Sequence, residues 1–507
     1  MRPIAEGFTD KLKASILLSD VFRHYGIEVK KQGKDFVCLS PFREERTPSL
    51  GIDDRKGLWI DRGDTNNKGD AITFIQLHDG VEYPQAVESL AQIANIPMEY
   101  KPMSENAQRW QAKSNMLFKV NAWAVEQFQK GLLESGEGVD YICNQRQITP
   151  DTIKEFGVGF TPGGFRYIRS LASNEQINAL VDADLLIRKI NDNGKKTLYD
   201  KFFGAERIMF PIKNTQGKVV AFGGRKLDTN DDPKAPKYTN TAETNIYKKG
   251  NELYGLYETL SKNKNAPEKI VIVEGYIDVL SMHQNGIGVA VSSNGTALTP
   301  EQVSKAFRYT DHVQFCFDGD SAGFKAAEKA MDTAMPFLED GKSASFVLLP
   351  QGHDADSILR GHGAEVMQDI LNKAVSVADF TMVRAKFGLD MQSEKDISIA
   401  AQRIVFMVSR MPIGLMRDRT ATVVGEQLNI NPQQLLKTID RVSDQRMKEE
   451  KERELKRESY KQQPSAKNTT PTNNNATIGG VNTGLTQQTA DGQSKKKPAP
   501  PMMKNSF

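Results

Sequence analysis

The stretch Lys269-Ile-Val-Ile-Val-Glu274 is a short apolar run that ends in a carboxylate, and it opens the most regular part of the chain. From here to residue 350, apolar runs alternate with segments of helical spacing. We expect strands at 269–273, 288–292, 312–317 and 344–349, and helices at 277–284, 300–309 and 321–339. Strands and helices that alternate in this way predict a doubly wound parallel sheet.

Acidic residues follow three of these predicted strands, at the point where each strand ends. They are Glu274 and Asp278, then Asp318 and Asp320, then Asp354 and Asp356. The carboxyl ends of parallel strands share one edge of a sheet, so these side chains are expected to lie together. Carboxylates gathered at one place repel one another unless divalent cations lie among them. The sequence therefore predicts a site for Mg²⁺ (or Mn²⁺) and phosphoryl transfer, with Glu274, Asp318 and Asp320 as the first ligands. The alternative is three acidic turns on a solvated edge.

Composition narrows the class of protein. A length of 507 residues suggests roughly three domains, and 38% hydrophobic with 26% charged residues is ordinary for a globular protein. The three cysteines are far apart, which favours a reducing compartment over a disulfide framework. No apolar run approaches the roughly 20 residues of a membrane span, and the N-terminus lacks a signal-peptide pattern. We therefore expect a cytoplasmic protein without membrane contact.

Changes in composition divide the chain into an expected α/β multidomain arrangement. Residues 446–459 alternate in charge and predict an exposed helix, whereas the following segment is rich in Asn, Thr, Gly and Pro and predicts disorder. The expected boundaries are a small N-terminal domain at 1–100, a polar linker at 101–114, a mixed α/β subdomain at 115–268, the parallel-sheet subdomain at 269–360, a helical subdomain at 361–445, and a charged helix with a disordered tail at 446–507.

The order of the acidic motifs resembles the toprim domain, which bacterial-type primases, topoisomerases and some nucleases share. Upstream, basic residues recur beside glycines and aromatic residues, a pattern that suits phosphate binding and base stacking. The segments are Arg207-Ile-Met-Phe-Pro-Ile212, Phe222-Gly-Gly-Arg225, Pro236-Lys237-Tyr238-Thr-Asn240 and Tyr247-Lys248-Lys249-Gly250. Together they resemble the bacterial DnaG-type DNA primase, a DNA-directed RNA polymerase that makes replication primers, over residues 8–440.

This resemblance implies a nucleotidyltransferase that binds single-stranded DNA and ribonucleoside triphosphates. Metals at the toprim edge would assist attack of a 3′-hydroxyl on the α-phosphate. The residues implied to bind nucleotide or template are Arg207, Arg225, Lys237, Tyr238, Lys248 and Lys249. Asp278, Asp354 and Asp356 are implied as further metal ligands, although the family's Asp-Pro-Asp is Asp354-Ala-Asp356 here.

The N-terminal domain resembles the zinc ribbon that opens these primases, but it departs from the family's ligands. The four ligand positions are occupied by Ser40, Arg43, Asp61 and Asp64. A structural zinc needs thiolates or imidazoles, so we expect a degenerate ribbon without zinc. We further expect Arg43 to pair with Asp61 and Asp64 as a substitute cross-link. The alternative is that the ligand positions changed by drift in a domain that is no longer used. The resemblance implies that this domain helps to choose where a primer starts, so loss of the metal would affect that choice.

Two other functions compete with the primase reading. A toprim nuclease shares the acidic edge but does not need the basic segments at 207–256. A non-catalytic DNA-binding replication protein is disfavoured because every expected carboxylate is present. A replicative helicase is a candidate partner, although the helical domain that usually contacts it has no counterpart after residue 440.

Overall fold

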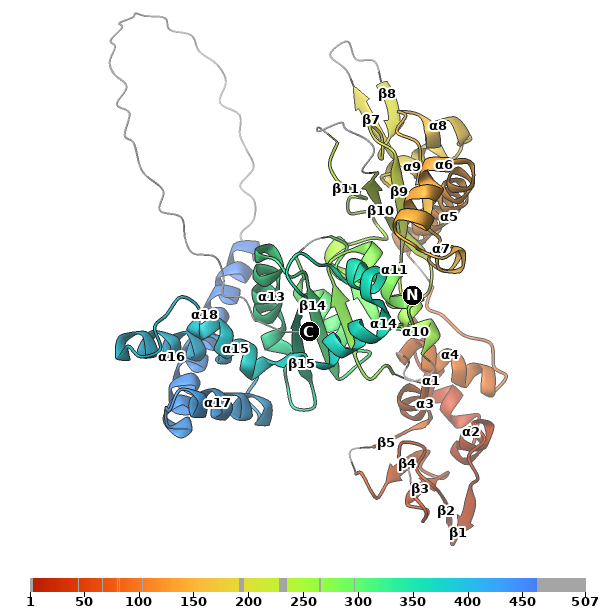
Figure 1. Cartoon of the computed structure of the whole chain (residues 1–507). Helices are drawn as coiled ribbons and strands as arrows, with labels where there is room; N and C mark the ends of the chain where they lie inside the picture. Colours follow the sequence, from red (N-terminus) through yellow and green to blue (C-terminus); the bar gives the residue numbers. More distant parts are fainter. Residues whose placement is uncertain are drawn as a thin grey trace, which may run out of the picture. The chain divides into compact units, whose positions relative to one another are not determined.

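The computed structural model describes residues 3–462, except 44, 66, 80, 82, 103, 191–195, 228–234, 264–265 and 296. It divides into two compact units (Figure 1). The first covers residues 1–119 and 263–266, and the second covers residues 120–262 and 267–507. The predicted disordered tail from residue 463 onward lies outside the described residues.

The first unit is a five-stranded antiparallel sheet with helices packed on it. The sheet order is β1-β2-β3-β4-β5. Its core gathers around Phe22, Trp59 and Phe74, all of which are buried. Two short helices begin the unit and are separated at Ser15, whose hydroxyl donates to the Leu12 carbonyl, and at Leu17, whose backbone is extended. The elements are α1 (Phe8–Ala14), α2 (Leu18–His24), β1 (Lys30–Gln32), β2 (Asp35–Cys38), β3 (Leu50–Asp53), β4 (Leu58–Asp61), β5 (Lys68–Gly69), α3 (Ala71–Asp79) and α4 (Tyr83–Ile93).

A long helix, α5 (Glu105–Glu134), follows and includes most of the segment predicted as a linker, so that segment is helical from Glu105 onward. The second unit then begins with an antiparallel sheet of order β11-β10-β9-β6 and a separate β7–β8 hairpin. The elements are α6 (Gly136–Val139), the π-helix η1 (Asp140–Gln145), α7 (Pro150–Phe156), β6 (Gly159–Thr161), α8 (Tyr167–Leu171), α9 (Ile177–Asp182), β7 (Leu186–Ile190), β8 (Lys196–Asp200), β9 (Arg207–Lys213), β10 (Val219–Lys226), β11 (Tyr238–Asn240), the 3-10 helix η2 (Lys249–Asn251) and α10 (Leu256–Lys262).

The predicted parallel sheet is confirmed, with the order β13-β12-β14-β15-β16. The four longer strands are parallel, and only the two-residue β16 runs antiparallel at the edge. In Figure 1, α13 lies on one side of β14, and α11 with α14 on the other. The elements are β12 (Ile270–Val273), α11 (Tyr276–Gln284), β13 (Ala290–Ser292), α12 (Pro300–Phe307), β14 (His312–Phe317), α13 (Ser321–Ala334), η3 (Met335–Phe337), β15 (Ser343–Leu348), α14 (Ala355–Asn372) and β16 (Val375–Ser376).

Four further helices complete the second unit: α15 (Val377–Lys386), α16 (Glu394–Val408), α17 (Leu415–Gln427) and α18 (Pro432–Gln462). They share one continuous hydrophobic core with the parallel sheet, from Leu253 through Phe346 and Phe380 to Ile439. The predicted charged helix at 446–459 is the last part of α18. No helix in the described part of the chain has the length and apolar character to cross a membrane.

Candidate active site

The acidic edge forms where β12 and β14 end side by side. The backbone N–H of Asp318 donates a hydrogen bond to Glu274 Oε1 at 3.2 Å, which joins the two strand ends. Because β12 and β14 are adjacent parallel strands, the first two acidic motifs meet as predicted.

In the part of the chain that the structure describes, Glu274 and Asp318 have no lysine or arginine partner. Burial, followed by the negative charges of Glu274, Asp278, Asp354 and Asp320, raises the pKa of Asp318 to about 8. Burial likewise raises the pKa of Glu274, against the hydrogen bond from the Asp318 N–H. An acidic group with a raised pKa ionises readily only when a cation stabilises its charge. The electrostatics therefore favour a bound cation beside Glu274 and Asp318.

Three of the other predicted ligands cap helices. Asp320 Oδ1 accepts from the N–H groups of Ala322 and Gly323 at 2.9 and 2.7 Å, at the start of α13. Asp278 Oδ2 accepts from the Gly275 N–H at 3.0 Å, and Asp354 accepts from the Ser357 N–H at 2.7 Å. Capping carboxylates stabilise helix N-termini. Within the described residues, no three His, Cys, Asp or Glu side chains gather around one point as a metal site. The carboxylate oxygens suit Mg²⁺ chemically, and the protein would supply only part of the coordination of such an ion.

Asp356 has a different environment from the other carboxylates. It is 1% exposed and lies between two arginines, Arg146 at 3.1 Å and Arg360 at 3.0 Å. Ser281 donates a further bond to it at 2.6 Å. Its charge is therefore balanced within the protein, which favours a structural role over the metal contact implied by resemblance.

Arg146 is a residue that the sequence reading missed. It directly follows the π-helix η1 and lies 210 positions before Asp356 in the chain. Its Nε also donates to the Tyr141 hydroxyl at 3.2 Å. A π-helix is often associated with functional sites, but no spacing motif in the sequence reveals one.

The basic segments lie in the same unit as the acidic edge. Arg225 on β10 donates to the Tyr238 hydroxyl on β11 at 2.8 Å, and its guanidinium faces the rings of Tyr141 and Tyr238. A chain of hydrogen bonds joins this sheet to the toprim sheet. The Tyr276 hydroxyl donates to Asn240 at 3.0 Å, and Asn240 donates to the Asn294 carbonyl at 2.8 Å.

The six predicted nucleotide-binding residues are not equally accessible. Lys237 and Lys248 are exposed, Lys249 and Tyr238 are half-buried, and Arg225 is buried. Arg207 is 1% exposed, and it donates to the carbonyls of Gly224 and Pro236 at 3.4 and 3.0 Å. Burial lowers the pKa of Arg207. Its observed contacts therefore support the backbone just before Lys237, and a phosphate contact stays a prediction.

Two glycines allow the acidic loops to pack against each other. A Cβ on Gly319 would collide with the carbonyls of Leu349 and Pro350, and one on Gly323 would collide with the carbonyl of Asp318. At both glycines the close neighbour is therefore backbone.

The first unit has its own charged corner at the predicted ligand positions. Arg43 pairs with Asp61 at 2.8 Å and with Glu45 at 2.6 Å. Ser40 donates to Asp61 at 2.6 Å, and Asp64 accepts from Asn67 at 3.5 Å. The predicted pair of Arg43 with Asp61 is confirmed, and Glu45 is a second carboxylate that the sequence reading missed.

Three family models match the chain. Residues 4–106 match the CHC2 zinc finger, residues 127–260 match the DNA primase catalytic core N-terminal domain, and residues 271–359 match the Toprim-like model. The three matches follow one another in the order that the sequence motifs predict.

Whole proteins and solved structures agree with these models. A DNA primase of Pasteurella multocida is 36% identical over 418 residues, which is 82% of this chain and 69% of that protein. A structure of the DnaG primase catalytic domain bound to ssDNA has a TM-score of 0.57 and 32% identity, covering 64% of this chain and 99% of that one. The Aquifex aeolicus primase (zinc binding and RNA polymerase domains) has a TM-score of 0.54 and 25% identity, covering 84% and 98%.

The expectation that zinc is absent is contradicted by these comparisons. The CHC2 zinc finger match and the zinc-binding domain of the Aquifex structure both point to zinc being present. The corner at Ser40, Arg43, Asp61 and Asp64 supplies no thiolate or imidazole, so its residues do not fit the family's ligand set. We therefore derive no step of the reaction through zinc.

The match to the Pasteurella multocida primase is decisive, because more than two thirds of that protein aligns with this chain at over 30% identity. The chain therefore belongs to the DnaG-type DNA primase family, whose members are DNA-directed RNA polymerases that synthesise replication primers by nucleotidyl transfer.

Proposed function

We propose that the acidic edge and the neighbouring lysines carry out RNA primer synthesis on a single-stranded DNA template. The observation that carries this assignment is the uncompensated pair of Glu274 and Asp318, half-buried at the ends of β12 and β14. Both belong to the same compact unit as Lys237, Lys248 and Lys249.

Glu274 and Asp318 are the residues that would hold Mg²⁺, with Asp320 beside them and Asp278 and Asp354 at the same edge. A bound cation would lower the pKa of the attacking 3′-hydroxyl and neutralise the leaving pyrophosphate. Mg²⁺ usually takes one or two carboxylates and completes its shell with water and substrate phosphates. This preference of Mg²⁺ is consistent with the small number of carboxylates that lie together at this edge.

The surface that carries Lys237, Lys248 and Lys249, here called the basic face, would hold the phosphates. Lys237 and Lys248 are exposed, and we assign them to template or nucleotide phosphates, with Lys249 beside them. Arg225 and Tyr238 form a cation–aromatic stack at this face, and Arg207 lies beneath it. The single-stranded DNA in the related catalytic-domain structure supports a DNA template here.

Several features of the chain outside the core belong to the same proposal. The predicted boundaries at 100, 114, 268, 360 and 445 are kept as proposed domain limits. The family matches at 4–106, 127–260 and 271–359 support those at 100, 268 and 360. The ribbon is proposed to be degenerate in the sense that Arg43 and its ion pairs occupy the usual ligand corner. A replicative helicase is the proposed partner, and the cytoplasm the proposed compartment, because primers are made where DNA is copied.

The test is primer synthesis on single-stranded DNA with labelled ribonucleotides and Mg²⁺. The wild-type protein should make short RNA, and Asp318→Ala/Asp320→Ala protein should make none while still binding DNA. Asp444→Ala, which changes an exposed aspartate on α18, is the matched control and should behave as wild type. Synthesis by the double variant would refute the assignment.

A further inference from the structure

The segment that carries Lys248 and Lys249 is held by side chains from α12. Gln302 is fully buried, and its Nε2 donates to the Glu252 carbonyl at 2.8 Å and to the Lys249 carbonyl at 3.3 Å. Its Oε1 accepts from the Thr299 N–H at 3.1 Å. One amide therefore joins both ends of η2 to the first turn of α12.

Two more side chains bond to the same backbone. The Thr299 hydroxyl donates to the Gly250 carbonyl, and Asn294 Nδ2 donates to the Glu252 carbonyl at 2.6 Å. Asn294 is fully buried. The carbonyls of Lys249, Gly250 and Glu252 thus accept bonds from three side chains that follow β13 in the parallel sheet, those of Asn294, Thr299 and Gln302.

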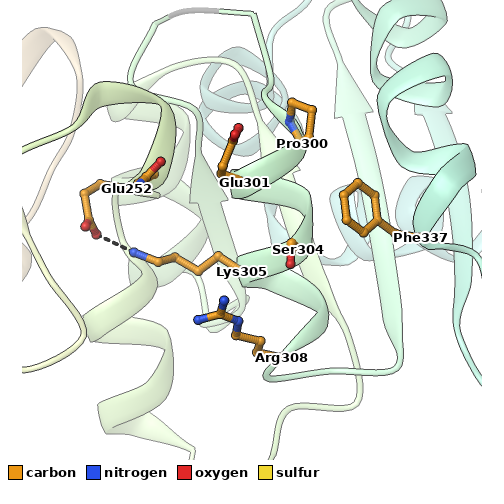
Figure 2. A pocket seen from close by; sticks show the side chains of 8 residues that line it. Glu252, Pro300, Glu301, Ser304, Lys305, Arg308 and Phe337 are labelled. Atoms are coloured by element: carbon orange, nitrogen blue, oxygen red, sulfur yellow. Dashed lines mark hydrogen bonds and ion pairs between the residues drawn. The ribbon is translucent and has the colours of Figure 1, made fainter. Parts of the chain in front are cut away.

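An ion pair between Lys305 and Glu252 adds a side-chain contact between α12 and the residue that follows η2. Lys305 Nζ lies 2.7 Å from Glu252, and the two side chains are only 17% and 15% exposed. Figure 2 shows Lys305 extending from α12 toward Glu252, with Ser304 on the same helix and Arg308 directly after it. Beside them is a cavity of about 380 Å³ that Asn251, Pro300, Glu301 and Phe337 also line.

We propose that Gln302 and the Lys305–Glu252 pair are positioning residues that place Lys248 and Lys249 against the triphosphate of the incoming nucleotide. The proposal rests on the proposed function of this site. β13, which precedes Asn294, pairs with β12, and β12 ends one residue before Glu274. The same sheet therefore fixes both the metal edge and the lysine segment.

The geometry explains why such a device is needed. A lysine side chain is long and flexible, so its ammonium group is placed only as well as its backbone is held. A lysine whose backbone is not held would have to be ordered when the nucleotide binds, and that ordering weakens binding. Within the described residues, Lys248 and Lys249 have no carboxylate partner that would restrain them. Burial also lowers the pKa of Lys249, which an approaching phosphate would reverse.

A purely structural role for these contacts predicts a different result, namely lower stability without a specific effect on nucleotide. The experiment therefore compares Lys305→Met with Lys213→Met. Lys213 forms an ion pair of the same length, 2.7 Å, with Glu258, and its side chain is 14% exposed. The two variants lose similarly buried lysines from matched pairs, but only one pair holds the lysine segment.

The measurement is the Kd of a non-hydrolysable ribonucleotide analogue with Mg²⁺, together with KM and kcat in primer synthesis. Lys305→Met should raise Kd and KM about tenfold with kcat changed less than about threefold, as expected for lost ground-state binding. Lys213→Met should leave Kd unchanged. The exchange Glu252→Lys/Lys305→Glu restores an ion pair and should bring Kd back to within about threefold of wild type.

Equal Kd values for Lys305→Met and Lys213→Met would overturn the proposal. Lys248→Ala/Lys249→Ala separates this failure from that of the proposed function. If Lys248→Ala/Lys249→Ala binds the analogue more weakly while Lys305→Met binds it normally, the nucleotide site is supported and the positioning role is refuted. If Lys248→Ala/Lys249→Ala also binds the analogue normally, these two lysines do not contact the triphosphate, and both assignments are refuted.

Discussion

The ribbon corner around Asp61 and the toprim edge around Asp318 are both acidic, yet they balance their charge in opposite ways. Burial raises the pKa of Asp61, but bonds from Ser40, the Gly63 N–H and Arg43 outweigh it, so the pKa is lowered. At Asp318 burial and neighbouring carboxylates both act upward, and the pKa reaches about 8. The corner contains Arg43 as its own cation, whereas Asp318 has no lysine or arginine partner among the residues that the structure describes.

This difference teaches how to separate structural carboxylates from functional ones within a single chain. Asp356 belongs with Asp61, because Arg146 and Arg360 compensate it although it follows a toprim strand. Groups whose charge is unbalanced in the folded protein are candidates for ligand binding. The comparison yields predictions that range from loss of chemistry to a small shift in stability.

The largest effect is expected at the uncompensated edge. Asp318→Asn keeps the shape of the side chain but removes the charge, and it should lower kcat for primer synthesis by at least about a thousandfold, since the cation would lose a main ligand. DNA affinity should stay within about twofold of wild type. Rates come from labelled ribonucleotide incorporation, and an active Asp318→Asn enzyme would place the metal elsewhere.

Removing a cation that balances a buried carboxylate should lower the stability of the protein. Arg146→Met leaves the buried Asp356 with Arg360 as its remaining cationic partner, and it should lower the free energy of unfolding by about 3 kcal/mol. Urea unfolding of the purified protein measures this. Arg169→Met changes a partly exposed arginine in the same unit and serves as the control. An unchanged midpoint for Arg146→Met contradicts a structural role for the pair.

A cation on the exposed basic face should give a smaller, salt-dependent effect. Lys237→Ala should weaken single-stranded DNA binding about threefold. It should also reduce the slope of log K against log salt by about 0.7, the amount expected for one lost phosphate contact. Lys437→Ala, an exposed lysine on α18, is the matched control. Titrations between low and moderate salt decide the matter, and an unaltered slope removes Lys237 from the phosphate contacts.

The smallest effect concerns the ribbon corner. Because the pKa of Asp61 in the folded protein is lowered below 3.8, its stabilising contribution is present at neutral pH and is lost as the pH falls below that value. Arg43→Met removes part of that lowering while burial remains, so Asp61 should stabilise the corner less at neutral pH, and less stability should be lost on acidification than in the wild type. Hydrogen exchange of residues 35–61 as a function of pH follows it. Identical profiles for wild type and variant would separate Arg43 from the stability of the corner.

Much of the catalytic unit could be predicted from sequence because its logic is local. An apolar run followed by an acidic residue identifies both a strand and the edge where it ends, and Glu274, Asp318 and Asp354 follow from that rule. The contacts of Asp356 could not be predicted, because Arg146 lies 210 positions away and follows a π-helix without a sequence signature. The expectation that zinc is absent was wrong: it rested on the residue types at four ligand positions, whereas residues 4–106 as a whole match the CHC2 zinc finger.

Arg207 and Gln302 show a second limit. Arginine beside a glycine-rich basic segment resembles a phosphate ligand in sequence, yet Arg207 is directed at carbonyls inside the fold. Gln302 is an ordinary helix residue in sequence, and only the structure reveals two backbone carbonyls within reach of its amide. Sequence gives the kind of side chain, whereas the direction in which it points depends on tertiary packing.

The hydrophobic core shared by the parallel sheet and the helices α15–α18 decides how the gene can be divided. Phe346 on β15 stacks on Phe380 of α15 with ring centroids 4.4 Å apart, and the cluster continues to Ile439. A fragment that stops after β16 would leave that apolar surface open to water and should aggregate. Recombinant fragments of the catalytic unit should therefore extend at least to residue 445.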